Sequence, residues 1–419
     1  MLLILCKRSQ MNRLIAVASD GSYFVLGYEN ILKVKAIDNK FTPTNLNKSA
    51  GKIKILKLSP NNEWIAWITK EPMELYIQSI QNSEYHLKLC NDKANLGFNE
   101  ILWSLDNMFL LVISKHSVYI DVIDIKNKTL MKIDGALSGN HNVSLCCFSP
   151  DGLYFAATTR SHPAVISVFK TDKWNKLNEL KVGSITDVGG MIWCKDSMSI
   201  LIWQRLLNYH LTLYSLDGRV EHESKKDFIS ISNISPAHNG RIISVQTDNF
   251  QIIIIDLLTW QETAVLQPLP VIINSEDTCV LKESVLFEVE NYRFLKATCF
   301  ELNDSIVDLI PIDKILKTKT SKQEFSACSY FLATYESQLG EVIWIWNIAK
   351  KKLHSVIILN EKDSAVRRIM WHHKELHLVV DIGLNKILIW NINNCFVIKA
   401  KDNETTVFNS ELYLSTIHV

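Results

Sequence analysis

The five residues Phe148-Ser149-Pro150-Asp151-Gly152 decide the fold of this chain. Proline presets φ and glycine accepts a positive φ, so Pro-Asp-Gly predicts a tight turn between two strands. Apolar stretches at residues 143–148, 153–158, 165–169 and 174–180 surround this turn. They predict four short strands joined by short turns, which together form one blade of a β-propeller.

The same phrase, an apolar residue followed by serine or a substitute and then by a turn, recurs along the chain. Its copies are Leu58-Ser59, Trp103-Ser104, Phe148-Ser149, Trp193-Cys194, Ile234-Ser235, Phe325-Ser326 and Trp371-His372. Positions 59, 104, 149 and 194 are 45 residues apart, and position 235 follows after 41. Two Trp-Asn pairs, at 346–347 and 390–391, are 44 residues apart. A fixed period of about 40–45 residues is typical of an array of four-stranded blades.

All 419 residues are therefore expected to form one all-β domain, a propeller of about seven to nine four-stranded blades. Two arrangements fit this count: a single ring, or one ring with extra blades beside it. The repeats are expected near residues 1–50, 51–95, 96–140, 141–185, 186–228, 229–268, 269–318, 319–362 and 363–405, with a partial closing segment at 406–419. The repeat at 269–318 is degenerate, because Ser235 and Ser326 are 91 residues apart, close to two periods. Ser9 marks the first repeat, and residues 85–97 are expected to be a loop or one helical turn.

The composition is that of an ordinary globular protein, with 47% hydrophobic and 21% charged residues. Lys plus Arg number 45 and Asp plus Glu 44, so the net charge of +1 creates no field that attracts nucleic acid or an anionic membrane. No stretch approaches the roughly 18 apolar residues of a membrane span. We expect neither a nucleic-acid partner nor a membrane partner. Residues 1–6 are apolar and precede Lys7 and Arg8, the reverse of the charge order of a secretory signal, so a strand is expected there.

Nine cysteines occur, and none forms a Cys-x-x-Cys pair, so neither a zinc ribbon nor a dithiol redox motif is expected. Cys146 and Cys147 are neighbours on a predicted strand, where successive side chains point to opposite faces. They would make a poor disulfide. We expect most of the nine to be buried, reduced thiols, which suits a cytosolic compartment.

The chain lacks the sequence signatures of the common catalytic and nucleotide-binding sites. It contains no G-x-S-x-G elbow, no G-x-x-x-x-G-K-[ST] loop and no G-x-G-x-x-G turn. Backbone cradles for phosphate need glycines at fixed offsets, and the whole chain has only 14. We therefore assign no catalytic residue, no cofactor-binding residue and no metal ligand, and we expect no cofactor and no enzymatic activity.

Two clusters of polar and charged residues allow both a structural and a functional interpretation. His373 and His377, in the segment 371–377, have the i, i+4 spacing that on a helix would hold a metal. The repeat frame instead places residues 372–375 in a turn, so an exposed polar turn is preferred. Residues 350–352 are three lysines that follow a Trp-Asn strand end, and a solvated turn is preferred there over a phosphate-binding patch.

Aspartates and Ser-Pro pairs at the ends of predicted strands also allow a structural and a functional interpretation. Asp121, Asp124 and Asp256 end apolar strands and are predicted to accept hydrogen bonds from turn amides rather than to act in catalysis. Ser-Pro pairs at 59–60, 149–150 and 235–236 could be kinase sites, but their regular spacing predicts turns.

The repeats resemble those of WD-repeat proteins, through residues 148–152 and the Trp-Asn ends. They resemble in particular the WD-repeat protein eight family of centrosomes and spindle poles. That narrower resemblance is carried by the blocks Leu213-Tyr214-Ser215-Leu216-Asp217-Gly218-Arg219, Leu258-Thr259-Trp260, Phe325-Ser326-x-x-Ser329-Tyr330-Phe331-Leu332-Ala333-Thr334 and Val342-x-Trp344-x-Trp346. The blocks occur in the same order and near the same spacing, and the match runs to about residue 400. The chain departs from the family pattern in lacking a strict Trp-Asp end and in its few glycines, and its last unit stops short, which leaves the closing of the ring open.

The resemblance implies a non-enzymatic scaffold at centrosomes, centriolar satellites and spindle poles, within the cytoplasm and cytoskeleton. It implies binding to a coiled-coil anchoring protein and to other components of the microtubule-organising centre. Through them the scaffold would support microtubule minus-end anchoring, spindle assembly and ciliogenesis, as a monomeric propeller within a complex. Because loops carry recognition, we expect partner contacts at residues 270–322 and in the turn at 371–377.

Two other functions stay open. A propeller that binds a small ligand or acts as an enzyme would need polar groups from several blades to converge at the channel mouth. The sequence shows no repeated inward-facing histidine or carboxylate. A translation-factor-like propeller that binds ribosomal RNA is disfavoured by the near-zero net charge.

Overall fold

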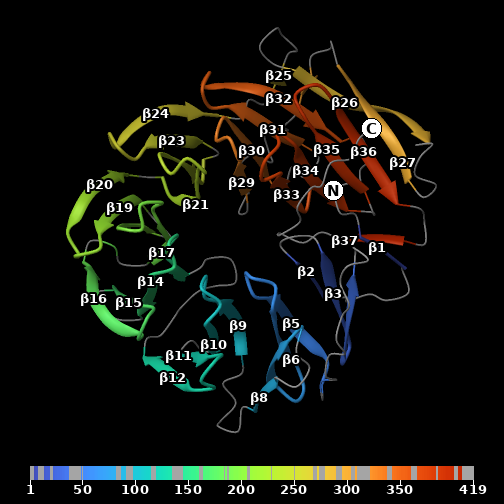
Figure 1. Ribbon diagram of the computed structural model, residues 1–419. Helices are drawn as coiled ribbons and strands as arrows, with labels where there is room; N and C mark the ends of the chain where they lie inside the picture. Colours follow the sequence, from blue (N-terminus) through green and yellow to red (C-terminus); the bar gives the residue numbers. More distant parts are fainter. Residues whose placement is uncertain are drawn as a thin grey trace.

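The structure is a computed structural model of the chain. It describes residues 4–7, 14–18, 22–36, 49, 51–81, 86–90, 98–114, 119–134, 145–159, 164–183, 185, 188–204, 208–227, 229–249, 251–267, 271–272, 279–288, 295–302, 307–308, 321–336, 342–359, 366–383, 386–400 and 404–407. All regular elements in these residues are strands, β1 to β37. The sheets surround a common centre (Figure 1). The expectation of an all-β fold is confirmed.

Five blades are separate sheets of four consecutive antiparallel strands. Their strands are β5 (Ile53–Leu58), β6 (Trp64–Thr69), β7 (Glu74–Ser79) and β8 (His86–Cys90); β9 (Phe98–Trp103), β10 (Phe109–Ser114), β11 (Tyr119–Asp124) and β12 (Leu130–Asp134); β13 (Cys146–Phe148), β14 (Tyr154–Thr159), β15 (Ala164–Lys170) and β16 (Asn175–Val182); β17 (Val188–Trp193), β18 (Ser199–Gln204), β19 (Tyr209–Ser215) and β20 (Val220–Lys226); and β21 (Ile231–Pro236), β22 (Ile242–Thr247), β23 (Ile252–Asp256) and β24 (Gln261–Leu266). Residues 86–90 are therefore a strand, not the loop or helical turn expected for 85–97.

The two ends of the described chain meet at the ring. β2 (Leu14–Val17), β3 (Tyr23–Tyr28) and β4 (Ile31–Ala36) form a three-stranded sheet. β1 (Ile4–Lys7) pairs antiparallel with β37 (Glu404–Val407), and this pair lies between β36 and the sheet β2–β4 (Figure 1). The first and the last described strands therefore meet in a separate two-stranded sheet.

The last two blades belong to a single ten-stranded sheet. One contains β29 (Ser321–Phe325), β30 (Phe331–Glu336), β31 (Val342–Asn347) and β32 (Lys352–Ile358), and the other contains β33 (Arg368–Trp371), β34 (Leu378–Gly383), β35 (Lys386–Trp390) and β36 (Cys395–Ala400). A hairpin of β26 (Cys279–Glu288) and β27 (Leu295–Leu302) joins their outer strands. β26 pairs in parallel with β32, and β27 pairs antiparallel with β36.

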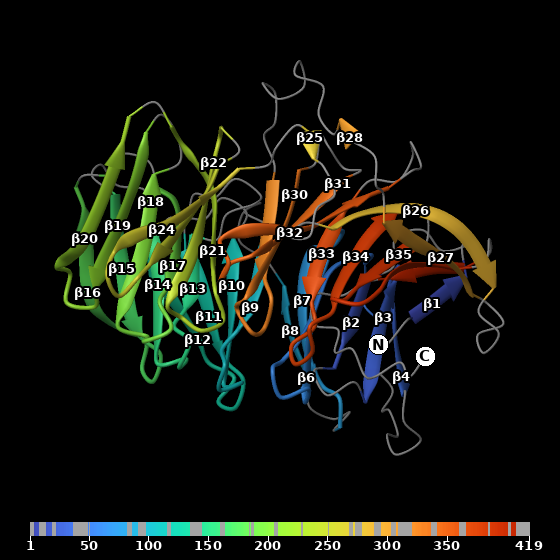
Figure 2. The ribbon, with the colours of Figure 1, turned by 90° about the horizontal axis from the view of Figure 1, so that it is seen from above.

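The described residues of the region 269–318 therefore differ from the degenerate repeat expected there. Besides the hairpin they contain only β25 (Val271–Ile272) and β28 (Val307–Asp308), which pair with each other (Figure 2). This region lacks the serine turn phrase that starts the neighbouring blades. The outer strands β32 and β36 would otherwise expose unpaired backbone groups, and the hairpin satisfies both edges.

Hydrogen bonds show which blades are neighbours on either side of the region 269–318. The Asn239 N–H donates to Ser329 Oγ at 2.9 Å, and Gln323 Nε2 donates to the Ser244 carbonyl at 3.0 Å. The blade β21–β24 therefore contacts the blade β29–β32 directly. The described strands form eight blades, seven with four strands and one, β2–β4, with three. This count lies within the seven to nine expected from the sequence.

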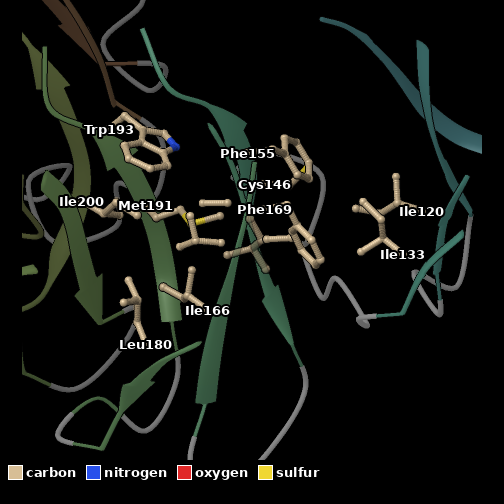
Figure 3. Close-up of a cluster of buried hydrophobic side chains, with 14 of the residues drawn as sticks. Ile120, Ile133, Cys146, Phe155, Ile166, Phe169, Leu180, Met191, Trp193 and Ile200 are labelled. Atoms are coloured by element: carbon tan, nitrogen blue, oxygen red, sulfur yellow. The ribbon is translucent and has the colours of Figure 1, made fainter. Parts of the chain in front are cut away.

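The core consists of the seams between blades. Figure 3 shows the two seams on either side of β13–β16, where apolar side chains of three blades meet. Labelled members are Ile120 and Ile133 from the preceding blade, Cys146, Phe155, Ile166, Phe169 and Leu180 from the blade itself, and Met191, Trp193 and Ile200 from the following one. Because both faces of a blade are covered, middle strands such as β23 are buried at every position and apolar without alternation.

Two positions of the repeat differ from their expected places. Ser235 lies inside β21, and the turn residue is Ala237, whose N–H donates to the Ile242 carbonyl as Ser59 does to Trp64. The shift occurs because Gly240, with φ of 71°, fixes the turn two residues later. In the first blade the corresponding residue is Ala18, which bonds Tyr23 in the same way. Ser9 lies outside the described residues.

Candidate functional site

The turns between first and second strands are built by one hydrogen-bond pattern. Ser149 Oγ accepts the Tyr154 N–H at 2.9 Å and donates to Asp151 Oδ1 at 2.6 Å, and that oxygen also accepts the Leu153 N–H at 3.0 Å. Burial acts to raise the pKa of Asp151, but the bonds from Ser149 and Leu153 outweigh it and hold the pKa below its ordinary value. Ser59, Ser104 and Ser326 accept the corresponding N–H. The Ser-Pro steps at 59 and 149 are therefore turns, as predicted.

The fourth residue of these turns is in the left-handed region. Its φ lies between 58° and 74° at Asn62, Asn107, Gly152, Ser197, Gly240 and Ser329. At Asn107, Ser197 and Ser329 the side chain of this residue accepts an N–H from the preceding blade. Asn107 Oδ1 accepts from Asn61 at 2.9 Å, and Ser197 Oγ accepts from Asp151 at 3.1 Å.

Where the fourth residue is glycine, a side chain from the preceding blade lies over it. A Cβ on Gly152 would be 3.1 Å from Leu105 Cβ, and a Cβ on Gly240 would be 2.6 Å from Lys195 Cβ. Neighbouring turns therefore touch each other, from the blade β5–β8 round to the blade β29–β32. Tryptophan side chains add a second link, because Nε1 of Trp193 donates to the Cys147 carbonyl at 3.1 Å and Nε1 of Trp371 donates to the Glu324 carbonyl at 2.8 Å.

The turns between third and fourth strands lie at the same end of each blade. The Ile125 N–H donates to the Met108 carbonyl at 2.9 Å, and the Thr171 N–H donates to the Leu153 carbonyl at 3.0 Å. The same bond joins Leu216 to Met198 at 2.8 Å. Together the two sets of turns make one surface, here called the turn face. It contains residues 59–63, 104–108, 149–153, 194–198, 237–241, 326–330 and 372–377, and residues 125–129, 171–174, 216–219, 257–260, 348–351 and 391–394.

Exposed apolar side chains gather on the turn face. Large apolar side chains that are exposed among the described residues are Leu105, Met108, Leu130, Leu153, Leu177, Met198, Val220, Leu258, Val265, Tyr330 and Ile392. All except Val265 lie in these turns or within the first three residues of a fourth strand. Seven of the eleven belong to the three consecutive blades β9–β20. Solvated side chains of this size on one continuous surface are typical of a protein contact.

The fifth residue of the first turn forms a row across those three blades. Met108, Leu153 and Met198 occupy it and are 40%, 54% and 56% exposed. We call these three residues the apolar row. Glu63 stands at the same position in the blade before, and Arg241 in the blade after. The row therefore ends in an acidic residue on one side and a basic residue on the other.

Carboxylates of the turn face are engaged within their own turns. Asp124 Oδ1 accepts the Asn127 N–H at 2.8 Å, and Asp256 Oδ1 accepts the Leu258 N–H at 2.9 Å, as predicted for both. Arg219 binds Asp217, and together with the Ser215 hydroxyl it lowers the pKa of Asp217 to about 2.

Asp121 does not have its predicted role. It lies inside β11, opposite Lys132 on β12, and not in a turn. Its Oδ1 is buried without a hydrogen-bond partner among the described residues. Burial raises the pKa of Asp121, against the attraction of the Lys132 ammonium group. The prediction was wrong because β11 does not end at Asp121 but continues to Asp124.

Residues 372–375 lie in a turn after β33, as predicted, although His372 is not exposed. His372 is buried, and its Nδ1 accepts the Glu375 N–H at 2.7 Å, so this ring replaces the turn serine. His377 Nδ1 lies 3.1 Å from Glu375 Oε2. The described residues contain no group of three or more His, Cys, Asp or Glu that could hold a metal. Lys350 and Lys351 are exposed in the turn after β31, as predicted, whereas Lys352, also exposed, is the first residue of β32.

The five cysteines whose side chains are described are free thiols. Cys146 and Cys395 are buried, Cys147 and Cys194 are partly buried and Cys328 is exposed. Burial raises the pKa of both Cys147 and Cys194 to about 12. These thiols are therefore protonated and poorly nucleophilic.

Of the predicted contact region 270–322, the structure describes residues 271–272, 279–288, 295–302, 307–308 and 321–322. No helix in the described part of the chain has the length and hydropathy needed to cross a bilayer. The sequence analysis missed the apolar row, although a signal existed. Met108, Leu153 and Met198 stand four residues after positions 104, 149 and 194, and an apolar residue is unexpected at the end of an exposed turn.

No protein-family model matches the chain. Its sequence is 23% identical over 346 residues to the WD repeat-containing protein WRAP73 of Mus musculus, an alignment that covers 77% of this chain and 73% of that protein. Its structure is similar to the C-terminal WD40 domain of Sif2, with a TM-score of 0.52 and 11% identity over 95% of this chain and 99% of that one. It is also similar to a crystal structure described as the eukaryotic initiation factor, with a TM-score of 0.60 and 12% identity over 97% of this chain and 90% of that one. These two likenesses concern the fold.

Proposed function

The chain is a WD-repeat β-propeller protein related to WRAP73, and on this premise we propose that it is a non-enzymatic scaffold of the centrosome and spindle pole. The scaffold binds a coiled-coil anchoring protein and so supports microtubule minus-end anchoring, spindle assembly and ciliogenesis. It works in the cytoplasm and cytoskeleton, including centriolar satellites, as a single propeller within a complex. The resemblance of the sequence blocks between residues 213 and 346 to the centrosomal family supports this location.

One structural observation carries the scaffold role. Seven of the eleven exposed large apolar side chains of the described residues lie on three consecutive blades. Exposed apolar side chains cost solubility, and a protein partner that covers them recovers the free energy of their burial. The carboxylates beside them bind their own turn amides, so this surface offers contact area rather than reactive groups.

Localisation and affinity capture test the proposal together. The full-length protein would carry a small tag and would be imaged in dividing cells, with a tagged version bearing Met108→Glu, Leu153→Glu and Met198→Glu beside it. We expect enrichment of the wild type at spindle poles and capture of coiled-coil and tubulin-organising proteins. An even distribution through the mitotic cytosol would contradict the proposal. Recovery of ribosomes instead would favour the RNA-binding alternative.

A further inference from the structure

We propose that the apolar row binds one amphipathic α-helix of a partner protein, with an apolar residue every seven positions and an acidic flank facing the rim of the propeller. This inference rests on the proposed scaffold function and adds the surface, the shape of the partner segment and its direction. Met108, Leu153 and Met198 are the anchor positions, one on each of three neighbouring blades.

The spacing of the blades matches the spacing of heptads. Sheets that pack face to face lie about 10 Å apart. Equivalent residues on neighbouring blades therefore repeat at about this distance, and the turns of these blades do touch, through Leu105 over Gly152 and through Asp151 to Ser197. Seven residues of an α-helix span about 10.5 Å. A helix with apolar residues at i, i+7 and i+14 therefore places one on each blade. The row ends where the equivalent position is occupied by Glu63 on one side and by Arg241 on the other.

Cations line the outer side of the row. Each carbonyl of the row accepts a hydrogen bond from the first residue of the adjoining outer turn, namely Ile125, Thr171 and Leu216. Those outer turns carry the exposed ammonium groups of Lys126, Lys128 and Lys173, besides the exposed Asp172 and the ion pair of Arg219 with Asp217. On the inner side, Asp106, Asp151 and Asp196 accept the N–H groups of Met108, Leu153 and Met198. A helix that lies on the row thus meets ammonium groups on its outward flank, which favours glutamate there.

The ends of the row give the helix a direction. A helix carries a partial positive charge at its N-terminus and a partial negative charge at its C-terminus. Glu63 stands beyond Met108, and Arg241 stands beyond Met198. Arg241 Nη2 forms an ion pair with Asp256 Oδ2 at 2.8 Å, whereas the exposed Glu63 carboxylate accepts a hydrogen bond from the Asn61 side chain. The favoured orientation places the N-terminus of the helix toward Glu63 and its C-terminus toward Arg241.

A defined peptide tests this without knowledge of the natural partner. The probe is a fluorescent three-heptad helical peptide with leucine at every seventh position and glutamate on one flank. A control peptide of identical composition has its leucines five residues apart. Fluorescence anisotropy with the full-length protein should show saturable binding of the first peptide and binding at least about tenfold weaker of the second. Equal affinity for both peptides, or binding of neither, would overturn the inference.

Protein variants locate the binding. Met108→Glu, Leu153→Glu and Met198→Glu should each weaken binding of the heptad peptide about tenfold or more, because each buries a carboxylate against leucine. Leu258→Glu and Ile392→Glu are matched controls, since both replace exposed apolar residues of the turn face outside the row. They should change the affinity less than about twofold. Circular dichroism and thermal unfolding confirm that each variant is folded. Equal losses in row and control variants would contradict the assignment.

Two further outcomes separate the surface from the function. If wild type and triple variant capture the same coiled-coil partner equally from cells, the row is not the docking site, whereas the scaffold function stands. If the wild type captures no such partner but binds the heptad peptide only through the row, the scaffold function fails and the surface stands. Light scattering tests the other occupant: a wild-type dimer that the triple variant dissociates would assign the row to a second copy of this chain and overturn the helix proposal.

Discussion

At the scale of single residues, the left-handed fourth position of each turn decides which side chain is allowed. Gly152 and Gly240 combine a positive φ with a close neighbour from the preceding blade. Asn62, Asn107, Ser197 and Ser329 adopt a similar φ. Asparagine tolerates this region better than most residues, and in these turns Asn107 and the two serines also bind a backbone N–H of the neighbouring blade.

Gly240→Ala should destabilise the protein by about 1–3 kcal/mol, because an added Cβ meets both a positive φ and Lys195 Cβ. The measurement is the free energy of unfolding from denaturant titration. Gly183→Ala is the control, since a Cβ there meets nothing within 4 Å. It should change the unfolding free energy by less than about 0.5 kcal/mol. Equal losses in the two variants would contradict the role given to Gly240.

The buried carboxyl group of Glu324 makes the free energy of unfolding depend on pH. Burial raises its pKa to about 7, although the Trp371 N–H and Arg368 act to lower it. The folded protein therefore binds more protons than the unfolded chain between the ordinary glutamate pKa and about 7. This group's contribution to stability is largest at the acidic end of that window and falls as pH rises through it.

Glu324→Gln should remove this contribution. Its unfolding free energy should exceed that of the wild type at pH 8, by up to about 3 kcal/mol, and the difference should shrink toward pH 5. Denaturant titrations at both pH values provide the measurement. A variant that gains nothing at pH 8 would show that the Glu324 carboxylate is not penalised by burial.

At the scale of elements, each blade is held by apolar third strands that neighbouring blades cover on both faces. Trp346 of β31 is buried, and its Nε1 donates to Thr334 Oγ1 at 3.0 Å. It packs in the seam with Val342 and Trp344.

Trp346→Ala should lower the unfolding free energy by about 3–5 kcal/mol, since it opens a cavity and leaves Thr334 without this donor. That is a large share of an ordinary total of about 5–15 kcal/mol. Trp346→Phe keeps most of the volume and should cost clearly less. Thermal and denaturant unfolding measure both, and equal costs would show that the loss is not due to the cavity.

The serine turns made most of the blades predictable. The serine, the acid two residues later and the glycine bind each other locally, so a repeat of 45 residues was visible in the sequence. Ser235 does not mark its turn, because Asn239-Gly240 forms the stronger turn signal and shifts the turn frame by two residues, to Ala237. The pairing of β26 with β32 and of β27 with β36 could not be predicted, because it joins segments distant in the chain without a local turn to reveal it.

The candidate site was harder to predict than the fold. Sequence reasoning placed partner contacts at 270–322 and 371–377, where the loops depart from the repeat. The apolar row lies instead within the most regular repeats. Only the structure shows that Met108, Leu153 and Met198 are exposed side by side, because the same residue types are buried elsewhere in the blades.

At the scale of the whole molecule, the pairing of β1 with β37 joins segments that are far apart in the sequence. Four residue pairs, from Ile4 with Val407 to Lys7 with Glu404, join the two ends of the described chain. Because β1 and β37 lie at opposite ends of the described chain, we expect the loss of their pairing to lower the stability of the propeller.

A double substitution of Thr405 and Thr406 by proline should disrupt this pairing, because proline cannot donate to a strand ladder. We expect a fall in the thermal midpoint of several degrees and faster proteolysis near both ends of the chain. Alanine at the same two positions keeps the backbone donors and is the control. A proline variant with unchanged midpoint and unchanged cleavage would show that the stability of the propeller does not depend on this pairing.

The hairpin of β26 and β27 divides the blades into two groups that differ in how neighbouring blades are joined. Six blades touch their neighbours only through side chains and turns, so each can tilt slightly against the next. The blades β29–β32 and β33–β36 are joined through backbone pairing of their outer strands with β26 and β27. We therefore expect the joined pair to move least, whereas the exposed methionines and leucines lie on blades that have no such backbone link to a neighbour among the described residues.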